Sequence, residues 1–498
     1  MAGFPPLPQK HFRALRRSPW IPLAACLLLP LATSTLTAQC ADPLLPCAQP
    51  ARNASAVHLL DEQKAYALDE LIDLAEANHP RTREAWERAL QAADRVGIAR
   101  SAYLPEFSLL ALFGDQRMIN PFPKPLAPRG YTMAEIPTVA PMLALDYALF
   151  DSGKRRATLE QNKAEQLAAK AGLERAHQDV ALNVVRAYYG LLTAQQRIEA
   201  ANRVLATAHT TQQAIESQLE NGRATLPDVL NARAATAQAE FNQESADGSM
   251  REARVLLRES LGVEPSDRIQ IAAPAATPDA LAVTLSIADL VREAQNMRPD
   301  LIQLQDDLKA STAEIRAAKA EQRPSLHLSA NLGQTAIWPT TDYGQLGNAN
   351  QTTWNVGVNF HWSVFDAGKR SLDVALAKSR QKEAAATLEE KQDSVTRETW
   401  SAYLDFRTAM RKYDAAQALR QAAQSSYDAN FEAFRYGVKN FIDVTSAEKQ
   451  LAEAEFTLVE AESSVWLSAT RLEYSTGHLL HSSVFIHHDA AQDAGKDR

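Results

Sequence analysis

The second half of this chain of 498 residues repeats the pattern of the first half. The phrase FDSGKR begins at Phe150 and returns as FDAGKR at Phe365, and a very long run without proline follows each copy. Further along, Gly222 and Gly437 keep the same offset of 215 residues. Self-similarity over such a period predicts two copies of one structural unit, so the same folding constraints act on the chain twice.

These correspondences predict the organisation of the whole chain. Each unit should contain a helix of moderate length, two strands, a very long helix, a tight turn and a second long helix. The expected segments are a signal peptide and leader at 1–40, a flexible segment at 41–65, the first repeat at 66–262, a Pro- and Ala-rich linker at 263–283, the second repeat at 284–479 and a flexible tail at 480–498.

The spacing of the prolines predicts unusually long helices. No proline lies between Pro141 and Pro227, and none follows Pro339. Small or apolar residues recur in these runs at alternating steps of four and three, the heptad pattern of helices packed along their length. A helix from Ser152 to about Glu220 would be ~100 Å long at 1.5 Å per residue, too long for a compact globule. We expect long hairpins at 151–262 and 366–477, tips near Gly222 and Gly437, and shorter helices at about 68–103 and 286–322.

The segments before each phrase alternate in polarity with period two. In 353–365, one face carries Trp354 and Phe360 and the other carries Asn355. Such strands are typical of a membrane β-barrel, although a half-buried soluble sheet gives the same local pattern. An open sheet edge cannot face lipid, so four strands would need other copies of the chain, and three copies would supply twelve strands. Two strands are expected within 105–150 and two within 324–365.

The N-terminus has the pattern of an export signal. Basic residues that include Arg16 and Arg17 lead into an apolar stretch at 20–32, and small or hydroxyl residues follow, so cleavage is expected near residues 38–40. An alternative is lipidation, because the sequence LAAC places Cys26 as an acylated cysteine. No apolar run of about 18 residues follows the leader, so we expect no transmembrane helix there.

Several function classes have no support in the sequence. The formal net charge is -8 and no basic patch is present, which excludes a typical nucleic-acid binder. We find no nucleophile elbow, glycine-rich phosphate loop or HExxH motif, and the 11 histidines are scattered. We therefore expect a protein that is not an enzyme and that has no cofactor and no metal site.

Taken in order, these motifs resemble the outer-membrane efflux protein family, the TolC-like channels. The resemblance rests on the repeated FD(S/A)GKR phrases and on the tips NGRATLPDVLNAR (221–233) and YGVKNFIDVTSAE (436–448), and it covers about residues 66–479. It implies a mixed α and β membrane protein. Three copies would share a 12-stranded β-barrel in the lipid of the outer membrane and an α-barrel of long helical hairpins in the periplasm.

The resemblance also implies a function and partners. The homotrimer would be the passive exit duct of a tripartite efflux pump, together with a periplasmic adaptor (membrane fusion) protein and an inner-membrane transporter of RND or ABC type. Two alternatives stay open. The duct could serve type I protein secretion, since the tunnel suits either transport system. The chain could also be a periplasmic coiled-coil structural protein that forms no channel, since heptads alone fit such a protein equally well.

Residues of the hairpin tips receive roles from the same resemblance. Acidic residues of the second hairpin form the periplasmic gate in this family; Asp443 matches the first, and Ser446 stands where the second would be. Alternatively, Asp443 only caps its helix. Polar contacts that restrain the gate would involve Asp228, Lys439 and Phe434. Because Lys439 replaces an arginine and Phe434 a tyrosine, we predict that a weaker Asp228–Lys439 link survives.

Two further groups of residues mark turns of the chain. The tips would dock the adaptor, and glycine is needed in such tight turns in any case. At the junctions from strand to helix, an aspartate would cap the new helix and a glycine would relax the bend. The tip residues are Gly222, Arg223, Gly437 and Val438, and the junction residues are Asp151, Gly153, Asp366 and Gly368.

Overall fold

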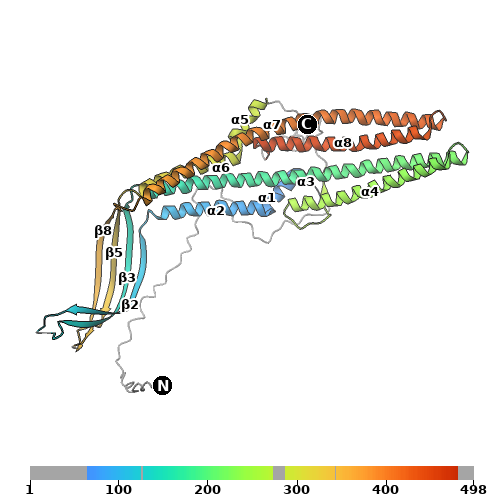
Figure 1. Cartoon of the computed structure of the whole chain (residues 1–498). Coiled ribbons are helices and arrows are strands. Elements are labelled where there is room, and N and C mark those ends of the chain that lie inside the picture. Colours follow the sequence, from blue (N-terminus) through green and yellow to red (C-terminus); the bar gives the residue numbers. More distant parts are fainter. Residues whose placement is uncertain (1–63, 125–126, 273–285, 343, 480–498) are drawn as a thin grey trace, which may run out of the picture. The chain divides into compact units, whose positions relative to one another are not determined.

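The computed structural model of the chain describes residues 64–124, 127–272, 286–342 and 344–479. The expected signal peptide, Cys26 and the C-terminal tail lie outside these residues, as does nearly all of the flexible segment expected at 41–65. The described residues belong to a single compact unit. They combine long helical hairpins with one antiparallel sheet, so the expectation of a mixed α and β chain is confirmed (Figure 1).

Two helical hairpins dominate the structure. The helices α3 (Lys154–Glu220) and α7 (Lys369–Arg435) have 67 residues each, which gives ~100 Å of length at 1.5 Å per residue. Each turns back into a shorter partner, α4 (Leu226–Ser260) and α8 (Phe441–Thr476) respectively. No helix in the described ranges combines the length and the apolar character that crossing a membrane requires.

The helices of moderate length are broken, where the sequence predicts one continuous helix in each unit. Pro80 and Pro299 each occupy the first position of a new helix, and the residue before each proline is extended, with ψ of 132° at His79 and 123° at Arg298. Proline favours that position because it lacks an N–H, and it disfavours a helical residue before it. The four helices are α1 (Leu68–Asn78), α2 (Pro80–Ser101), α5 (Ile287–Met297) and α6 (Pro299–Ala320).

Four long strands form the sheet in the order β2-β3-β5-β8, all antiparallel. Two short strands extend it beside the far end of β3. The last strand ends at His361, although the alternating pattern predicts a strand as far as Phe365. The strands are β2 (Glu106–Pro121), β3 (Tyr131–Phe150), β5 (Ser325–Ile337), β6 (Thr340–Thr341), β7 (Gly344–Gln345) and β8 (Ala349–His361).

One face of the sheet is apolar and uncovered in the single chain. Trp354 is 74% exposed and Leu109 is 80% exposed, while polar side chains such as Asn331 and Asn355 contact each other on the opposite face. The strands pack closely: a Cβ on Gly333 would lie 2.4 Å from the carbonyl oxygen of Pro141, so only glycine fits there. This face would meet water in a soluble monomer, which is an unfavourable arrangement for an apolar patch of this kind.

The helices form a layer with two free edges. Helix α3 packs against α2 and α4 on one side and against α6 and α8 on the other, and α7 packs on α6 and α8. Figure 1 shows α2 and α4 following one another along α3. The layer therefore runs from α2 and α4, through α3, to α6 and α8, and ends at α7.

Part of the expected linker is structured. The short strand β4 (Gln270–Ile271) lies within 263–283 and pairs in parallel with β1 (Ala65–Tyr66). Tyr188 of α3 donates a hydrogen bond of 2.6 Å to the carbonyl oxygen of Ala272, and Ile269 is buried in the largest core cluster. The described part of this segment is thus packed on the helices rather than being a free connection.

A buried network of charges fixes the break between α5 and α6. The fully buried Arg298 donates hydrogen bonds to Asp300 (2.6 Å) and to Glu398 of α7 (2.7 Å). Asp300 also lies 3.0 Å from Lys391 and 3.5 Å from Arg175 of α3. Burial alone would raise the pKa of Asp300, but hydrogen bonds and positive charge from Arg298 hold it well below its usual range.

Candidate functional site at the hairpin tips

Both hairpins reverse direction through the same turn. At the first tip, the N–H of Gly222 donates to the carbonyl oxygen of Leu219 (2.9 Å), and the N–H of Arg223 donates to that of Gln218 (2.8 Å). These two bonds define a Schellman motif, whose glycine adopts a left-handed backbone, here with φ of 65°. Gly437 has φ of 77° and the same pair of bonds. The turn leaves the side chains of Arg223 and Val438 exposed.

The first tip continues into a reciprocally capped helix. The carboxylate of Asp228 accepts hydrogen bonds from the backbone N–H of Thr225 (2.9 Å) and from its hydroxyl (2.6 Å). Thr225 is the N-cap of α4 and Asp228 its third helical residue, which is the geometry of a capping box. Asp228 is therefore bound to its own helix.

We predict that Asp228→Ala loosens the first turn of α4. The loss of a capping side chain costs about 1 kcal/mol. Hydrogen–deuterium exchange of the amides at 225–229 should accelerate roughly fivefold, since about 1 kcal/mol corresponds to that factor. Asp443→Ala is the matched control, and equal acceleration at 441–445 in that variant would contradict the assignment.

The second tip is capped differently. Asn440 is the N-cap of α8, and its side-chain oxygen accepts a hydrogen bond of 2.9 Å from the N–H of Asp443. The alternative that Asp443 itself caps the helix is therefore wrong. Its carboxylate lies 3.5 Å from Lys439 Nζ in a partly exposed ion pair, a weak contact in water. Ser446 is exposed one turn farther along the same face.

The predicted link between Asp228 and Lys439 does not form within one chain, and between neighbouring copies it stays a prediction. No hydrogen bond or ion pair in the described ranges joins these two residues, because Asp228 binds Thr225 and Lys439 pairs with Asp443. Both nevertheless line one groove of about 710 Å³ between the two tips. Arg223 and Ile442 also line it, so the groove presents charged and apolar groups together.

The side chain of Phe434 lies in the core and makes no polar contact. It is buried between the hairpins, with its ring centroid 6.4 Å from that of Phe441. Across the hairpins, Gln218 of α3 donates a hydrogen bond of 3.5 Å to the carbonyl oxygen of Phe434. The side chains of Tyr427 and Thr211 also contact each other there through their hydroxyl groups, at 3.3 Å. Sequence reasoning missed this pair, because two ordinary helical residues 216 positions apart carry no mark of their contact.

Other polar contacts lie farther from the tips, along the interface between α3 and α8, which we call the seam. Thr193 of α3 donates a hydrogen bond of 2.7 Å to Ser463 of α8, and Arg203 of α3 bonds Glu455 of α8 at 2.7 Å. The seam between α3 and α8 is thus held by apolar packing near the tips and by spaced polar bonds behind it.

The junctions between strands and helices share one geometry. Asp151 accepts hydrogen bonds from the N–H groups of Gly153 (3.1 Å) and Arg155 (2.7 Å), and Asp366 does the same for Gly368 and Arg370 at 3.1 Å each. Both glycines have a left-handed backbone, with φ of 88° at Gly153 and 86° at Gly368. A carboxylate placed before a helix satisfies free N–H groups, so these residues turn the chain from sheet to helix.

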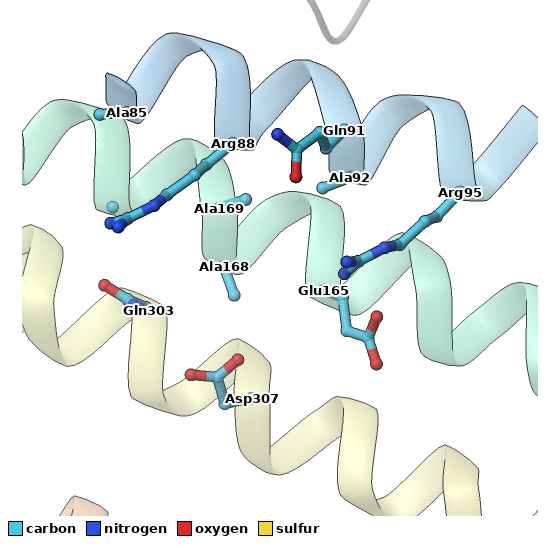
Figure 2. A pocket seen from close by; sticks show the side chains of 11 residues that line it. Ala85, Arg88, Gln91, Ala92, Arg95, Glu165, Ala168, Ala169, Gln303 and Asp307 are labelled. Atoms are coloured by element: carbon cyan, nitrogen blue, oxygen red, sulfur yellow. The ribbon is translucent and has the colours of Figure 1, made fainter. Parts of the chain in front are cut away.

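A second hollow lies far from the tips, between α2, α3 and α6. Figure 2 shows Arg88 extending from α2 toward Gln303 of α6 and Arg95 extending from α2 toward Glu165 of α3, with Asp307 of α6 on the opposite wall. The cavity measures about 430 Å³. Burial raises the pKa of Asp307, and the negative charge of Glu165 raises it further. No group of three or more histidine, cysteine or acidic side chains in the described part of the chain could hold a metal ion.

Comparison with known proteins agrees with this architecture. The model of the family described as "Outer membrane efflux protein" matches residues 71–263 and 290–478. "Protein CyaE" of Bordetella pertussis is 27% identical over 371 residues, 74% of this chain and 73% of that protein. "Outer membrane protein TolC" of Salmonella enteritidis is 23% identical over 426 residues, covering 84% and 83% of the two chains.

Solved structures agree on the fold. A membrane protein of Pseudomonas aeruginosa superposes with a TM-score of 0.71 at 21% identity, covering 82% of this chain and 93% of that one. The matches of the family model fall on both halves and together span most of the described residues. The chain therefore belongs to the outer membrane efflux protein family.

Proposed function

We propose that three copies of this chain form the exit duct of a tripartite efflux system in the outer membrane. The proposal rests on the edges of the sheet and of the helical layer, which have no neighbour on their outer side in the described part of the single chain. At one edge lie strand β2 and helix α2, which are consecutive in the sequence, and at the other lie strand β8 and helix α7, which are also consecutive. A head-to-tail contact between copies would join both layers at once and close a ring.

The helical edges support this closure. Apolar residues occur on each edge two positions away from buried ones, which places them on the side of the helix that faces away from the layer. All of them are at least 40% exposed in the single chain. They are Leu90 and Ile98 of α2, Leu230 and Phe241 of α4, and Leu372, Leu376, Trp400 and Leu404 of α7.

The sheet supports the membrane location. An open edge of unpaired N–H and C=O groups is not tolerated in lipid, but pairing β8 with β2 of the next copy removes every edge. Three copies give twelve strands, within the known range of membrane barrels. The apolar face with Trp354 and Leu109 would then meet lipid. A coiled-coil structural protein would leave this face without a role.

The tips would form the periplasmic end of the duct. The groove between them would receive the adaptor, and the inner-membrane transporter of RND or ABC type would deliver the substrate. A duct of this kind conducts passively and does not itself catalyse a reaction. The same duct would serve type I protein secretion.

The native particle tests the proposal. Outer membranes would be isolated, extracted in mild detergent and the complex weighed, then reconstituted in planar bilayers. We expect a particle of three mature chains that resists washing at high pH and conducts ions. A monomer or dimer released from the periplasm without detergent would contradict the proposal, because four strands cannot close alone.

We predict that Asp443→Asn weakens block of this channel by divalent cations. Three copies would place three Asp443 carboxylates around the axis, where they repel one another and attract cations. Removing three charges should raise the half-blocking concentration at least tenfold, measured from single-channel currents. Asp428→Asn, an exposed position on α7, serves as the control. Equal block in wild type and Asp443→Asn would exclude Asp443 from the constriction.

A further inference from the structure

A cavity whose lining includes several charged side chains lies where the two hairpins meet. It measures about 250 Å³ and begins ~10 Å along α8, counting 1.5 Å per residue from Phe441. Helices α3, α7 and α8 all contribute to it. Its charged and polar lining consists of Arg203, Thr207, Arg420, Gln424, Glu448 and Glu455.

One acidic residue in this cavity is fully paired. Glu455 is 5% exposed, and its two carboxylate oxygens accept hydrogen bonds from Arg203 Nη2 (2.7 Å) and Arg420 Nε (2.9 Å). The bond with Arg203 of α3 joins the two hairpins, and the bond with Arg420 of α7 lies within the second hairpin. This arrangement leaves no cation for a second carboxylate.

Glu448 is that second carboxylate. It is 8% exposed, and none of the ion pairs found among the described residues includes it. Burial raises the pKa of Glu448 to about 6, opposed only by a hydrogen bond with Thr211. Tyr427 of α7 lies against the same threonine, and burial raises its pKa too. A neutral Glu448 is therefore compatible with the packed seam, whereas its carboxylate is not.

We propose that Glu448 is a proton-binding site that makes the contact between the two hairpins depend on pH. The ionisable groups that face it are Arg203 of α3, Arg420 and Tyr427 of α7, and Glu455 of α8. An ionised Glu448 either draws Arg420 away from Glu455 or moves out to water. Both responses weaken the seam between α3 and α8. The inference rests on the proposed function in one respect, namely that parting of the hairpins opens the duct.

The direction of the effect follows from proton linkage. An exposed glutamate has an ordinary pKa of 4.5, whereas Glu448 in the packed seam keeps its proton up to a pH of about 6. Below pH 4.5 both forms are neutral and the seam has its full strength. Between these values the separated form loses its proton first, so the ratio of separated to packed hairpins rises by up to about 30-fold; above them it is constant.

Distances between spin labels at the two tips test the proposal. Labels would be attached at Asn221→Cys and Tyr436→Cys in a chain whose own cysteines, Cys26, Cys40 and Cys47, are replaced by serine. Labelled chains would be diluted with unlabelled ones, and pulsed electron resonance would be recorded from pH 4 to pH 8. We expect the population with widely separated labels to rise between about pH 4.5 and pH 6.

Two variants and one control isolate Glu448. Glu448→Gln and Glu448→Met cannot ionise, so both should keep the pH 4 distribution at every pH, and either alone suffices if the other does not assemble. Glu453→Gln removes an exposed carboxylate of the same helix and should behave as wild type. A wild-type distribution that does not change with pH, or a Glu448→Gln protein that titrates as wild type, would overturn the inference.

Currents through reconstituted protein separate this inference from the proposed function. A protein that conducts but shows no titration of the tip distance retains the proposed function and refutes the role of Glu448. A protein whose tip distance titrates but which never conducts supports the proton site and refutes the duct.

Discussion

Arg298→Met is expected to destabilise the protein by about 3–5 kcal/mol. Removal of one partner from a buried ion pair leaves the other charges unpaired, which costs more than the pair itself contributes. Here Asp300 would keep Lys391 and Arg175 but lose its two hydrogen bonds from Arg298, and Glu398 would lose the bond that joins α7 to the start of α6. Unfolding by guanidinium, followed by far-UV circular dichroism, measures the change.

Arg292→Met is the matched control for this prediction. Arg292 lies on α5, six residues before Arg298, and pairs with Asp289 in an exposed salt bridge. Its loss should change the free energy of unfolding by less than about 0.5 kcal/mol, since exposed pairs contribute little. If the two substitutions change the free energy of unfolding equally, burial of Arg298 does not determine its contribution to stability.

The contribution of Arg298 should depend on pH in one direction. Asp300 has a lowered pKa in the folded protein, so its stabilising effect is complete above the unfolded value of about 3.9 and is lost as the pH falls below it. The difference between wild type and Arg298→Met is therefore expected to be constant above about pH 5 and to shrink below about pH 4.

Leu404→Glu is expected to abolish the proposed trimer while leaving the fold of each chain intact. Leu404 is 53% exposed at the free edge of α7. Its burial would contribute about 2 kcal/mol at each of three interfaces, so about 6 kcal/mol is lost before the cost of burying three carboxylates is counted. The mass of the detergent-extracted particle measures the outcome.

Leu167→Glu provides the control for the edge. Leu167 is 40% exposed on α3, but α3 has neighbours on both sides, so this side chain faces out of the layer rather than toward another copy. Trimers should persist in this variant. Trimers of unchanged stability in Leu404→Glu would show that the edge of α7 is not the contact between copies.

Much of the fold could be predicted because it depends on local signals. Runs without proline, heptads and glycine at the tips specify the hairpins, and period-two alternation specifies the strands. The breaks at Pro80 and Pro299 also had a local signal, since proline after an extended residue commonly begins a helix. The strand at Gln270–Ile271 had none, because two residues are too few to show a period.

The residues that tie the structure together could not be predicted in the same way. Arg298 and Glu448 look like ordinary polar residues of helices, and only the packing of distant segments buries them. Asp228 and Asp443 occupy equivalent positions in the sequence, yet the carboxylate of Asp228 accepts hydrogen bonds from its N-cap residue, whereas that of Asp443 pairs with Lys439. The difference lies in their caps, threonine in one case and asparagine in the other, and in the orientation that each cap permits.

The unequal caps have a mechanical consequence. In the first turn of α4, the Asp228 carboxylate accepts two hydrogen bonds from Thr225, whereas the N-cap of α8 makes one such side-chain bond, from the N–H of Asp443 to Asn440. Two halves of similar sequence therefore differ in stiffness at their ends. The first turn of α4 is therefore expected to open locally at a higher free-energy cost than that of α8, so a difference in the capping residues gives the two hairpin ends different resistance to bending.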